Sequence, residues 1–138
     1  MTAYLDTTQD AARALVMRGI RGPLVMLNLL RFREVADYSH APQLAPAEPI
    51  SGAKAYDLYT KQVQPLLEAS GGRLLFKGEA GRFLIGPEDE QWDLAMLVEQ
   101  SSLESFFAFA QEPKMEAILA HRTAALLDSR LLPLAQLA

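Results

Sequence analysis

Cysteine is absent from this 138-residue sequence, and histidine occurs only twice. Without thiols the chain can form no disulfide, no thiolate metal site and no cysteine nucleophile. Long apolar runs are missing too, since none approaches the roughly 18 residues of a membrane-spanning helix. Acidic residues stand near the N-terminus, where a signal peptide would carry basic ones. We therefore expect a cytoplasmic protein with no metal site, no secretion signal and no membrane segment.

Positive charge is scarce as well. The 13 Lys and Arg residues are outnumbered by 17 Asp and Glu residues, which gives a formal net charge of −4. The basic residues are scattered rather than gathered in a stripe, and this pattern disfavours nucleic acid as a partner. The strings HExxH, GxSxG and GxGxxG and the P-loop are also missing, so no motif-bearing hydrolase, dinucleotide-binding or nucleotide-binding class is supported. We predict no resident cofactor.

What the sequence does contain is an ordinary globular composition. Half of the residues are hydrophobic. A chain of this length removes roughly two thirds of its unfolded surface from water, so its core needs neither disulfides nor metals. No linker, internal repeat or low-complexity block interrupts it. We predict that residues 1–138 form a single domain.

The first part of the chain predicts a helix, a strand and a long loop. An Ala-rich segment at about residues 7–18, with Thr7 as a potential N-cap, indicates a helix. In residues 24–32 both alternate sets of side chains are apolar, as in a strand that is covered on both faces. Residues 34–51 contain three prolines and little periodicity, so we expect a loop with few buried contacts that is the most mobile segment.

The second part predicts two further helices and three strands. Ser51 can cap a helix that a Gly-Gly pair ends. Two alternating segments, at about 73–86 and 92–99, predict a hairpin with a tight polar turn. A capping box at Ser101 begins a helix that Pro113 splits, and the apolar tail suits an edge strand.

Apart from the first helix, this order is the split βαβ pattern of a ferredoxin-like α+β domain, βαββαβ. Helices are expected to cover one face of the sheet. The other face would expose a large apolar patch, which is rare on monomers, so we predict a homodimer whose two sheets pack into a dimeric α+β barrel. A ligand pocket would lie between sheet and helices or inside the shared barrel.

Several segments resemble one family of small bacterial proteins. They are GPLVMLNLLRFRE with its internal Asn28, the helix start SGAKAYDLY, Gly71-Gly72 before a strand, Trp92-Asp93 at a strand opening, and the Glu112-Pro113 break followed by His121-Arg122. Together they are similar to the domain-of-unknown-function 1330 family of the dimeric α+β barrel superfamily, over almost the whole chain. The resemblance implies that fold and a dimer, without an assigned activity, in a superfamily that includes cofactor-independent monooxygenases.

Four aromatic or amide side chains are candidate ligand contacts. Asn28 interrupts an apolar strand, and a buried amide needs a hydrogen-bond partner, which is either a ligand or a structural group. Tyr56 and Tyr59 share the apolar stripe of a helix, where their rings fill the core and only their hydroxyls are free to act. Trp92 could line a pocket as readily as fill the core.

Arg122 is the fifth candidate, because it extends the inward-facing stripe of the last helix, where a hydrophobic residue would be expected. A charge at this position needs a partner. We predict either an anionic or carbonyl-bearing ligand, or an internal ion pair with Asp93 or Asp128.

Two residues are weak candidates for catalysis. His121 is the one histidine in a predicted helix, since His40 lies in the proline-rich loop, and it could serve as a general base or a haem ligand. A surface histidine favoured by the helix dipole is the plainer alternative. Asp93 belongs to a row of charged hairpin positions in which Lys77 faces Glu99, and this row could move a proton or simply form ion pairs.

These observations leave three functions open. The first is an enzyme like the cofactor-independent monooxygenases, which binds a small organic molecule and polarises its oxygens with Asn28, Tyr56 and Arg122. The second is a non-catalytic protein that binds or senses such a ligand. The third is a haem-binding protein. The first rests on analogy with the superfamily, and the sequence does not separate it from the second.

Overall fold

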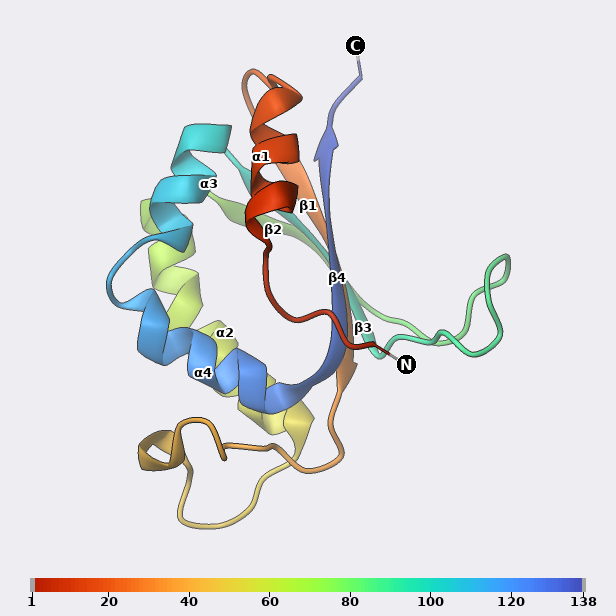
Figure 1. The fold of residues 1–138 in the computed structure, drawn as a ribbon, viewed down its shortest axis with the longest axis vertical. Helices are drawn as coiled ribbons and strands as arrows, with labels where there is room; N and C mark the ends of the chain where they lie inside the picture. Colours follow the sequence, from red (N-terminus) through yellow and green to blue (C-terminus); the bar gives the residue numbers. More distant parts are fainter. Residues whose placement is uncertain (1, 138) are drawn as a thin grey trace.

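In a computed structural model that describes residues 2–137, four α-helices, one short 3-10 helix and four strands are arranged around a single sheet (Figure 1). In chain order the elements are α1 (Gln9–Met17), β1 (Leu24–Phe32), η1 (Pro42–Leu44), α2 (Gly52–Ala69), β2 (Arg73–Glu79), β3 (Leu94–Gln100), α3 (Leu103–Ala110), α4 (Met115–Ala125) and β4 (Leu126–Ala135). With α3 and α4 as the two halves of a split helix, the order after α1 is βαββαβ, as the sequence predicts.

The sheet has the strand order β2-β3-β1-β4, and every neighbouring pair is antiparallel. This order places the first and third strands at the centre, which is the ferredoxin-like arrangement of an α+β domain. The predicted fold class is confirmed. β4 is an edge strand, as predicted, and the edge tolerates Pro133 because no ladder partner there needs its missing N–H.

Three helices begin at a hydroxyl side chain that accepts a backbone N–H of the first turn. Ser51 caps α2, as the sequence predicts. The cap of α1 is Thr8 rather than Thr7, and the cap of α3 is Ser102 rather than Ser101. In both cases the neighbouring hydroxyl residue takes the role, so these helices start later than the sequence indicates.

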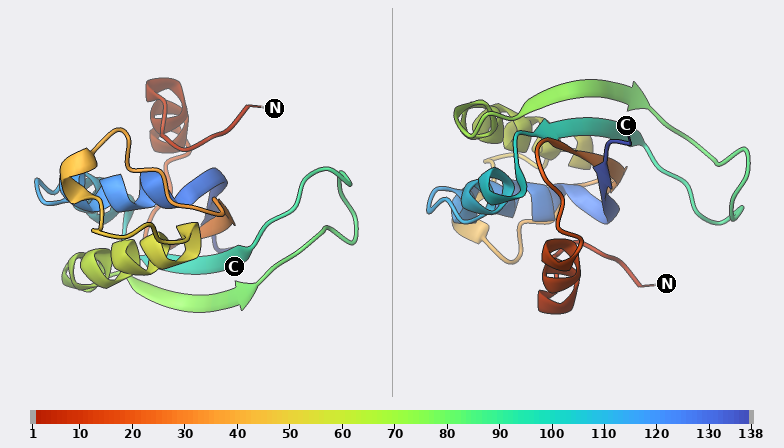
Figure 2. Two further views of the ribbon diagram at one scale, coloured as in Figure 1. Left: turned by 90° about the horizontal axis from the view of Figure 1, so that it is seen from below. Right: turned by 90° about the horizontal axis from the view of Figure 1, so that it is seen from above.

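The two faces of the sheet have different surroundings. Helices α2, α3 and α4 lie on one side of it, as both views in Figure 2 show. Leu24, Met26 and Leu30 of β1 point to that side and are buried. The residues of the opposite side, here called the helix-free face, follow from the register and are Val25, Leu27, Leu29, Arg31, Arg73, Phe76, Gly78, Ala95, Leu97, Glu99, Asp128, Arg130, Leu132 and Leu134.

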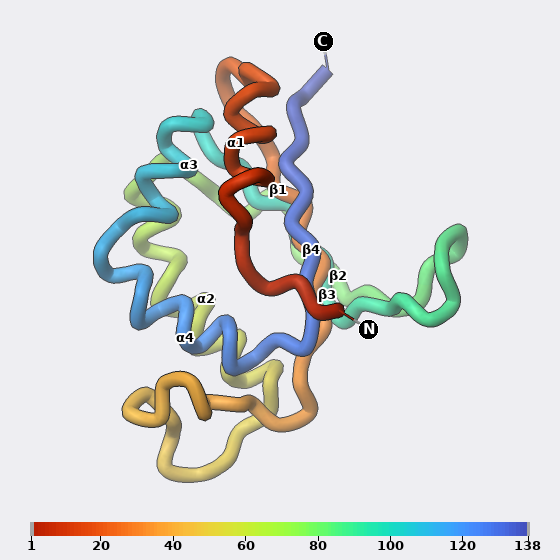
Figure 3. The backbone as a smooth tube through the Cα atoms, in the orientation of Figure 1, coloured from red at the N-terminus to blue at the C-terminus, as the bar shows by residue number. Residues whose placement is uncertain are grey.

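The proline-rich loop lies against the C-terminal half of α4 (Figure 3). Tyr38 and Ala41 of this loop are buried, and the Asp37 N–H donates to the Ala124 carbonyl over 2.9 Å. The expectation that the loop makes few buried contacts is therefore wrong. The sequence did not predict the burial of Tyr38, because a single aromatic residue in a segment without periodicity does not indicate which surface it packs against.

Residues 80–93 form a long hairpin arm between β2 and β3, here called the arm. The Ala80 N–H donates to the Asp93 carbonyl, and the Trp92 N–H donates to the Gly81 carbonyl, each over 3.0 Å. The arm extends away from the body of the protein on the side opposite the helices (Figures 1 and 2). The predicted tight turn is thus only the far end of a much longer excursion.

The register between β2 and β3 differs from the expected pairing of charges. Lys77 pairs with Met96, after a β-bulge that shifts the register by one residue between Leu74 and Phe76. Arg73 takes the place opposite Glu99, and its Nε lies 3.0 Å from the Glu99 carboxylate. The predicted Lys77–Glu99 pair is wrong because the two strands pair about a centre at residue 86, two residues before Glu88, and this displacement moves the partner of Glu99 by four positions.

Between residues 2 and 137 no helix is long and apolar enough to cross a membrane. The same part of the chain contains no group of three or more histidine and acidic side chains that could hold a metal ion.

Candidate functional site

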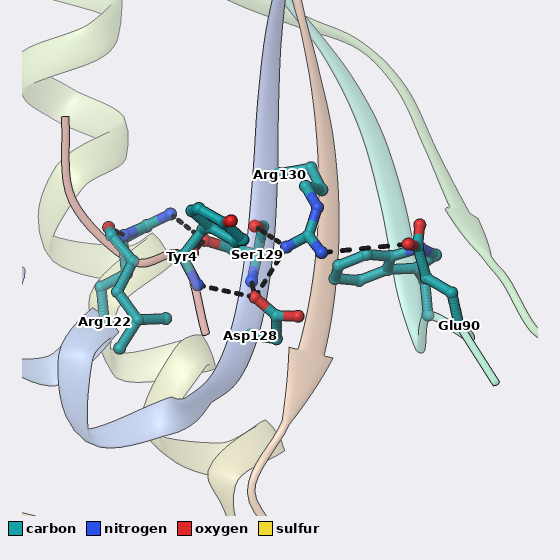
Figure 4. Close-up of polar contacts among 8 residues, drawn as sticks. Tyr4, Glu90, Arg122, Asp128, Ser129 and Arg130 are labelled. Atoms are coloured by element: carbon teal, nitrogen blue, oxygen red, sulfur yellow. Dashed lines mark hydrogen bonds and ion pairs between the residues drawn. The ribbon is translucent and has the colours of Figure 1, made fainter. Parts of the chain in front are cut away.

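Arg122 occupies the helix side of the sheet near the free edge of β4. Its Nη1 donates to the Leu5 carbonyl over 2.8 Å, and its Nη2 donates to the Ser129 hydroxyl over 3.3 Å (Figure 4). The ion pairs of residues 2–137 involve Arg73 and Arg130 but not Arg122. A partly buried guanidinium is therefore held by neutral acceptors alone.

This arrangement corrects the predicted ion pair of Arg122. Asp128 lies on the helix-free face and accepts a hydrogen bond from Arg130 over 2.7 Å. The Asp93 carboxylate accepts the Phe32 N–H over 2.8 Å. Both predicted carboxylate partners are engaged elsewhere, because strand alternation and the end of β1 direct them away from α4.

Tyr56 and Tyr59 of α2 face the same interior. Their ring centroids are 5.1 Å apart, and the Tyr56 ring also packs on Phe32 at 5.5 Å. Burial raises the pKa of both hydroxyls, and the nearby charge of Arg122 opposes this rise. At neutral pH both hydroxyls thus stay protonated, and each can donate a hydrogen bond to an oxygen.

Asn28 belongs to the helix-facing set of β1, between Met26 and Leu30. Its Nδ2 donates to the Met26 carbonyl over 3.2 Å, which satisfies one of the two amide hydrogens. Leu30 pairs with Ser129 in the register, so Asn28 is a diagonal neighbour of that serine, at about 7–8 Å between Cα atoms. Asn28 and Arg122 therefore approach the same stretch of β4.

Trp92 is placed on the opposite side of the sheet. The chain bends at Asp93, so Trp92 does not continue the helix-facing set of β3. The Arg130 guanidinium lies 4.9 Å from the centre of its ring and 4.8 Å from that of Tyr4. The Trp92 Nε1 donates to Glu90 over 3.2 Å. Trp92 is thus part of a cation–π cluster at the base of the arm.

Asp128 completes this cluster (Figure 4). Partial burial by itself would raise the pKa of Asp128, but hydrogen bonds from the Tyr4 N–H, Arg130 and the Ser129 N–H outweigh it and hold the pKa below its ordinary value. The N-terminal segment is therefore attached to β4 from both faces, since the Leu5 carbonyl accepts from Arg122 on the helix side.

His121 points away from Arg122 and contacts the proline-rich loop. Its Nδ1 lies 2.7 Å from the Tyr38 hydroxyl, and the two rings meet edge to face. The side chain is only 7% exposed, and burial lowers the pKa of the imidazole. A neutral ring with Nδ1 as acceptor fits this contact, in which the hydroxyl donates.

Two open clefts lie outside this interior. One, of about 560 Å³, is at the base of the arm and includes Arg33, whose buried Nε has no hydrogen-bond partner among the described residues. The other, of about 600 Å³, lies between the C-terminal end of α1 and the C-terminal segment. Neither cleft is lined by Asn28 or Arg122.

The structure thus divides the candidates that the sequence names. Asn28, Tyr56, Tyr59 and Arg122 all lie on the helix side of the sheet, with both tyrosines near Arg122, whereas Trp92, Asp93 and His121 make their contacts elsewhere. Sequence reasoning missed Ser129, Tyr38 and Arg130. A serine and an arginine in an apolar edge strand are visible signals in retrospect, but only the register assigns them to opposite faces.

Chemically, the four converging side chains offer one cation, two hydroxyl donors and one amide. Such a set can hold a carboxylate or carbonyl oxygen beside aromatic rings. It contains no nucleophile and no base, because the neutral imidazole and the Asp93 carboxylate lie outside it.

Comparison with known proteins identifies the family of this chain. The family described as "Domain of unknown function (DUF1330)" matches residues 47–132, which is more than half of the chain. The chain belongs to the DUF1330 family. The match begins just before α2 and ends at residue 132, within β4, and so includes Tyr56, Tyr59 and Arg122, while Asn28 lies before it. None of the curated proteins matches the chain significantly.

Solved structures agree with membership of the DUF1330 family. A protein of unknown function from Rhodopseudomonas palustris, RPA0582, has 34% sequence identity and a TM-score of 0.82, and the match covers 99% of each chain. The methylated form of RPA0582 gives a TM-score of 0.85 at 34% identity, covering 100% of this chain and 98% of the other. The resemblance inferred from the sequence is confirmed for both family and fold.

Proposed function

We propose that this DUF1330 protein binds a small organic molecule with a carboxylate or carbonyl group in the space between its sheet and helices α2 and α4. The observation that carries this proposal is Arg122, a partly buried cation held by a carbonyl and a hydroxyl without a carboxylate. Burying an uncompensated charge is costly, and an anionic ligand oxygen would offset that cost. Asn28, Tyr56 and Tyr59 supply further polar atoms on the same side.

Non-catalytic binding fits the arrangement better than catalysis. The two residues nominated as acid or base, His121 and Asp93, are engaged by Tyr38 and by the Phe32 N–H. Neither lies beside Arg122. A reaction in this space would have to rely on polarisation of the ligand alone, as in the monooxygenase-like alternative. A haem would need His121, whose buried ring is packed against the proline-rich loop.

The test of the ligand site is thermal stabilisation by benzoate, compared with its uncharged isostere benzamide, in wild type and in Arg122→Ala. We expect benzoate to raise the Tm of the wild type more than benzamide does, and the difference to vanish in the variant. The variant itself should lose about 1–3 kcal/mol of unfolding free energy, because two hydrogen bonds from a charged donor are removed but no carboxylate is stranded.

Arg18→Ala provides a matched control for Arg122→Ala. Arg18 also donates to a backbone carbonyl, that of Pro133, over 2.8 Å, but it is the C-cap residue of α1 and lies away from the proposed site. The control should keep the full benzoate response. A benzoate response equal in both variants, or absent from the wild type, would contradict the proposal.

We also propose that the protein is a homodimer through its helix-free face. Phe76 and Leu132 on this face are more than half exposed, and Leu134 is more than one third exposed. Together with the half-buried residues of β1 and β3 they form an apolar surface of the kind that monomers rarely leave uncovered. A second sheet packed face to face would cover it.

A further inference from the structure

The far end of the arm presents an apolar tip that no other segment of residues 2–137 covers. Leu84 is 100% exposed and Ile85 is 92% exposed, and the preceding Phe83 is partly exposed. The arm is nevertheless held in a defined hairpin at its base, where Arg82 and Gln91 form a bridge. Large aliphatic side chains at the end of a built projection are typical of an interaction surface rather than of a free loop.

The direction of the arm indicates which surface of a partner it can contact. The arm leaves the sheet on the side opposite α2, α3 and α4, which is the side of the helix-free face (Figure 2). A partner that covers the helix-free face therefore comes within reach of the arm. In a twofold dimer each copy presents one face and one arm, so each contact is made twice.

The area of the face alone is small for a stable dimer. The four strands contain 9, 7, 7 and 10 residues, and at about 3.3 Å per residue and about 4.8 Å between strands they give a flat face of about 520 Å². Stable complexes bury roughly 800 Å² on each partner. The arm can supply the missing contact area.

The charges of the two surfaces are complementary. The arm holds one basic residue and four acidic ones, for a net charge of −3, and the helix-free face holds three arginines and two acidic residues, for a net charge of +1. The residues counted are Arg82, Glu88, Asp89, Glu90 and Asp93 of the arm, and Arg31, Arg73, Arg130, Glu99 and Asp128 of the face. Arg73 and Arg130 are paired within their own chain, with Glu99 and with Asp128 and Glu90, so among residues 2–137 the opposite charges that remain for contact between copies are Arg31 of the face and Glu88 and Asp89 of the arm.

We propose that each arm embraces a second copy of this chain and buries Leu84 and Ile85 against the helix-free side of that copy. The proposal rests on the homodimer proposed above and adds the arm as a second contact between the two copies. Since Leu84 and Ile85 are almost fully exposed in their own chain, nearly all of their apolar surface is available for burial on association.

The first test is the dimer dissociation constant of Leu84→Asp/Ile85→Asp, measured by analytical ultracentrifugation. We expect a dimer of twice the 15.2 kDa chain mass for the wild type. The double variant should dissociate at least about 100-fold more readily, because two large apolar side chains no longer leave water. The matched control is Val16→Asp/Met17→Asp on α1, whose side chains are 53% and 80% exposed. This control should keep the wild-type constant.

The second test does not depend on the stability of the double variant. Because the chain has no cysteine, Ile85→Cys gives a single attachment site for a benzophenone label. After mixing of ¹⁴N and ¹⁵N protein, irradiation should give cross-linked peptides of mixed isotope composition that join the arm to β1 or β4 of another molecule. Cross-links within one molecule only, or to helices only, would overturn the proposal.

The outcomes separate the two proposals. A monomeric wild type would refute both the homodimer and the embrace. A dimeric wild type whose dissociation constant is unchanged in Leu84→Asp/Ile85→Asp, without intermolecular cross-links, would refute the embrace and leave the homodimer standing.

Discussion

His121 shows how one buried contact can couple stability to pH. Its Nδ1 lies 2.7 Å from the Tyr38 hydroxyl, in a pair that joins α4 to the proline-rich loop. Burial lowers the pKa of His121 in the folded protein, whereas an unfolded histidine titrates near about 6.5. The unfolded chain therefore binds the proton first as the pH falls. The stability supplied by the neutral ring is complete above about pH 6.5 and is lost progressively below it.

We therefore expect His121→Gln to flatten the pH dependence of stability between about pH 7 and pH 5.5. In the wild type this histidine contributes a slope of at most about 1.4 kcal/mol per pH unit. Urea unfolding of both proteins across this range measures it. The control is His40→Gln, which replaces the only other histidine, an exposed one. If His121→Gln keeps the wild-type slope, the Tyr38–His121 contact is not the source.

At the scale of elements, the N-terminus of α2 is joined to two other segments through their backbones. The Gly52 N–H donates to the Arg33 carbonyl over 3.0 Å, and the Arg33 N–H donates to the Ala125 carbonyl over 2.8 Å. The end of β1, the start of α2 and the end of α4 thus meet at one point. A Cβ on Gly52 would overlap the Arg33 carbonyl oxygen and lie 2.6 Å from that of Ala125. The glycine is required by this close approach rather than by its φ angle.

Gly52→Ala should destabilise the protein by at least about 2 kcal/mol, since backbone atoms cannot yield as a flexible side chain does. Thermal or urea unfolding will show the loss. Gly81→Ala is the matched substitution, because a Cβ there meets nothing within 4 Å, and it should change stability by less than about 0.5 kcal/mol. Equal effects of the two substitutions would be incompatible with the close packing at Gly52.

For the molecule as a whole, the proposed dimer depends on the helix-free face. Leu131 and Leu132 are consecutive residues of β4 that point to opposite faces and are 44% and 53% exposed. They have the same side chain and nearly the same exposure. Only Leu132 lies on the face that the proposed dimer would bury.

We predict that Leu132→Asp dissociates the dimer and that Leu131→Asp does not. The wild-type Tm should rise with protein concentration, because dimerisation stabilises the folded state by mass action. In Leu132→Asp this dependence should disappear. Light scattering and thermal melts at several concentrations provide the readout. If Leu131→Asp dissociates the dimer, or if neither substitution does, the interface does not lie on the helix-free face.

The sequence by itself determined the fold class, the order of the elements and the family. These follow from local signals: hydroxyl caps such as Ser51, the Pro113 break in the last helix, and alternation along residues 24–32. Periodicity also indicated that Asn28, Tyr56, Tyr59 and Arg122 point inward. Each of these properties depends on neighbours within a few residues, so the sequence carries it directly.

The tertiary structure decided which groups meet. A hairpin centred two residues before Glu88 placed Arg73 rather than Lys77 opposite Glu99, and a bend at Asp93 turned Trp92 towards Arg130. Arg122 is held by Leu5, 117 positions away in the chain. Such contacts depend on strand register and on distant segments packed side by side. A shift of one residue reverses the face of every side chain that follows it, and no local pattern encodes that shift.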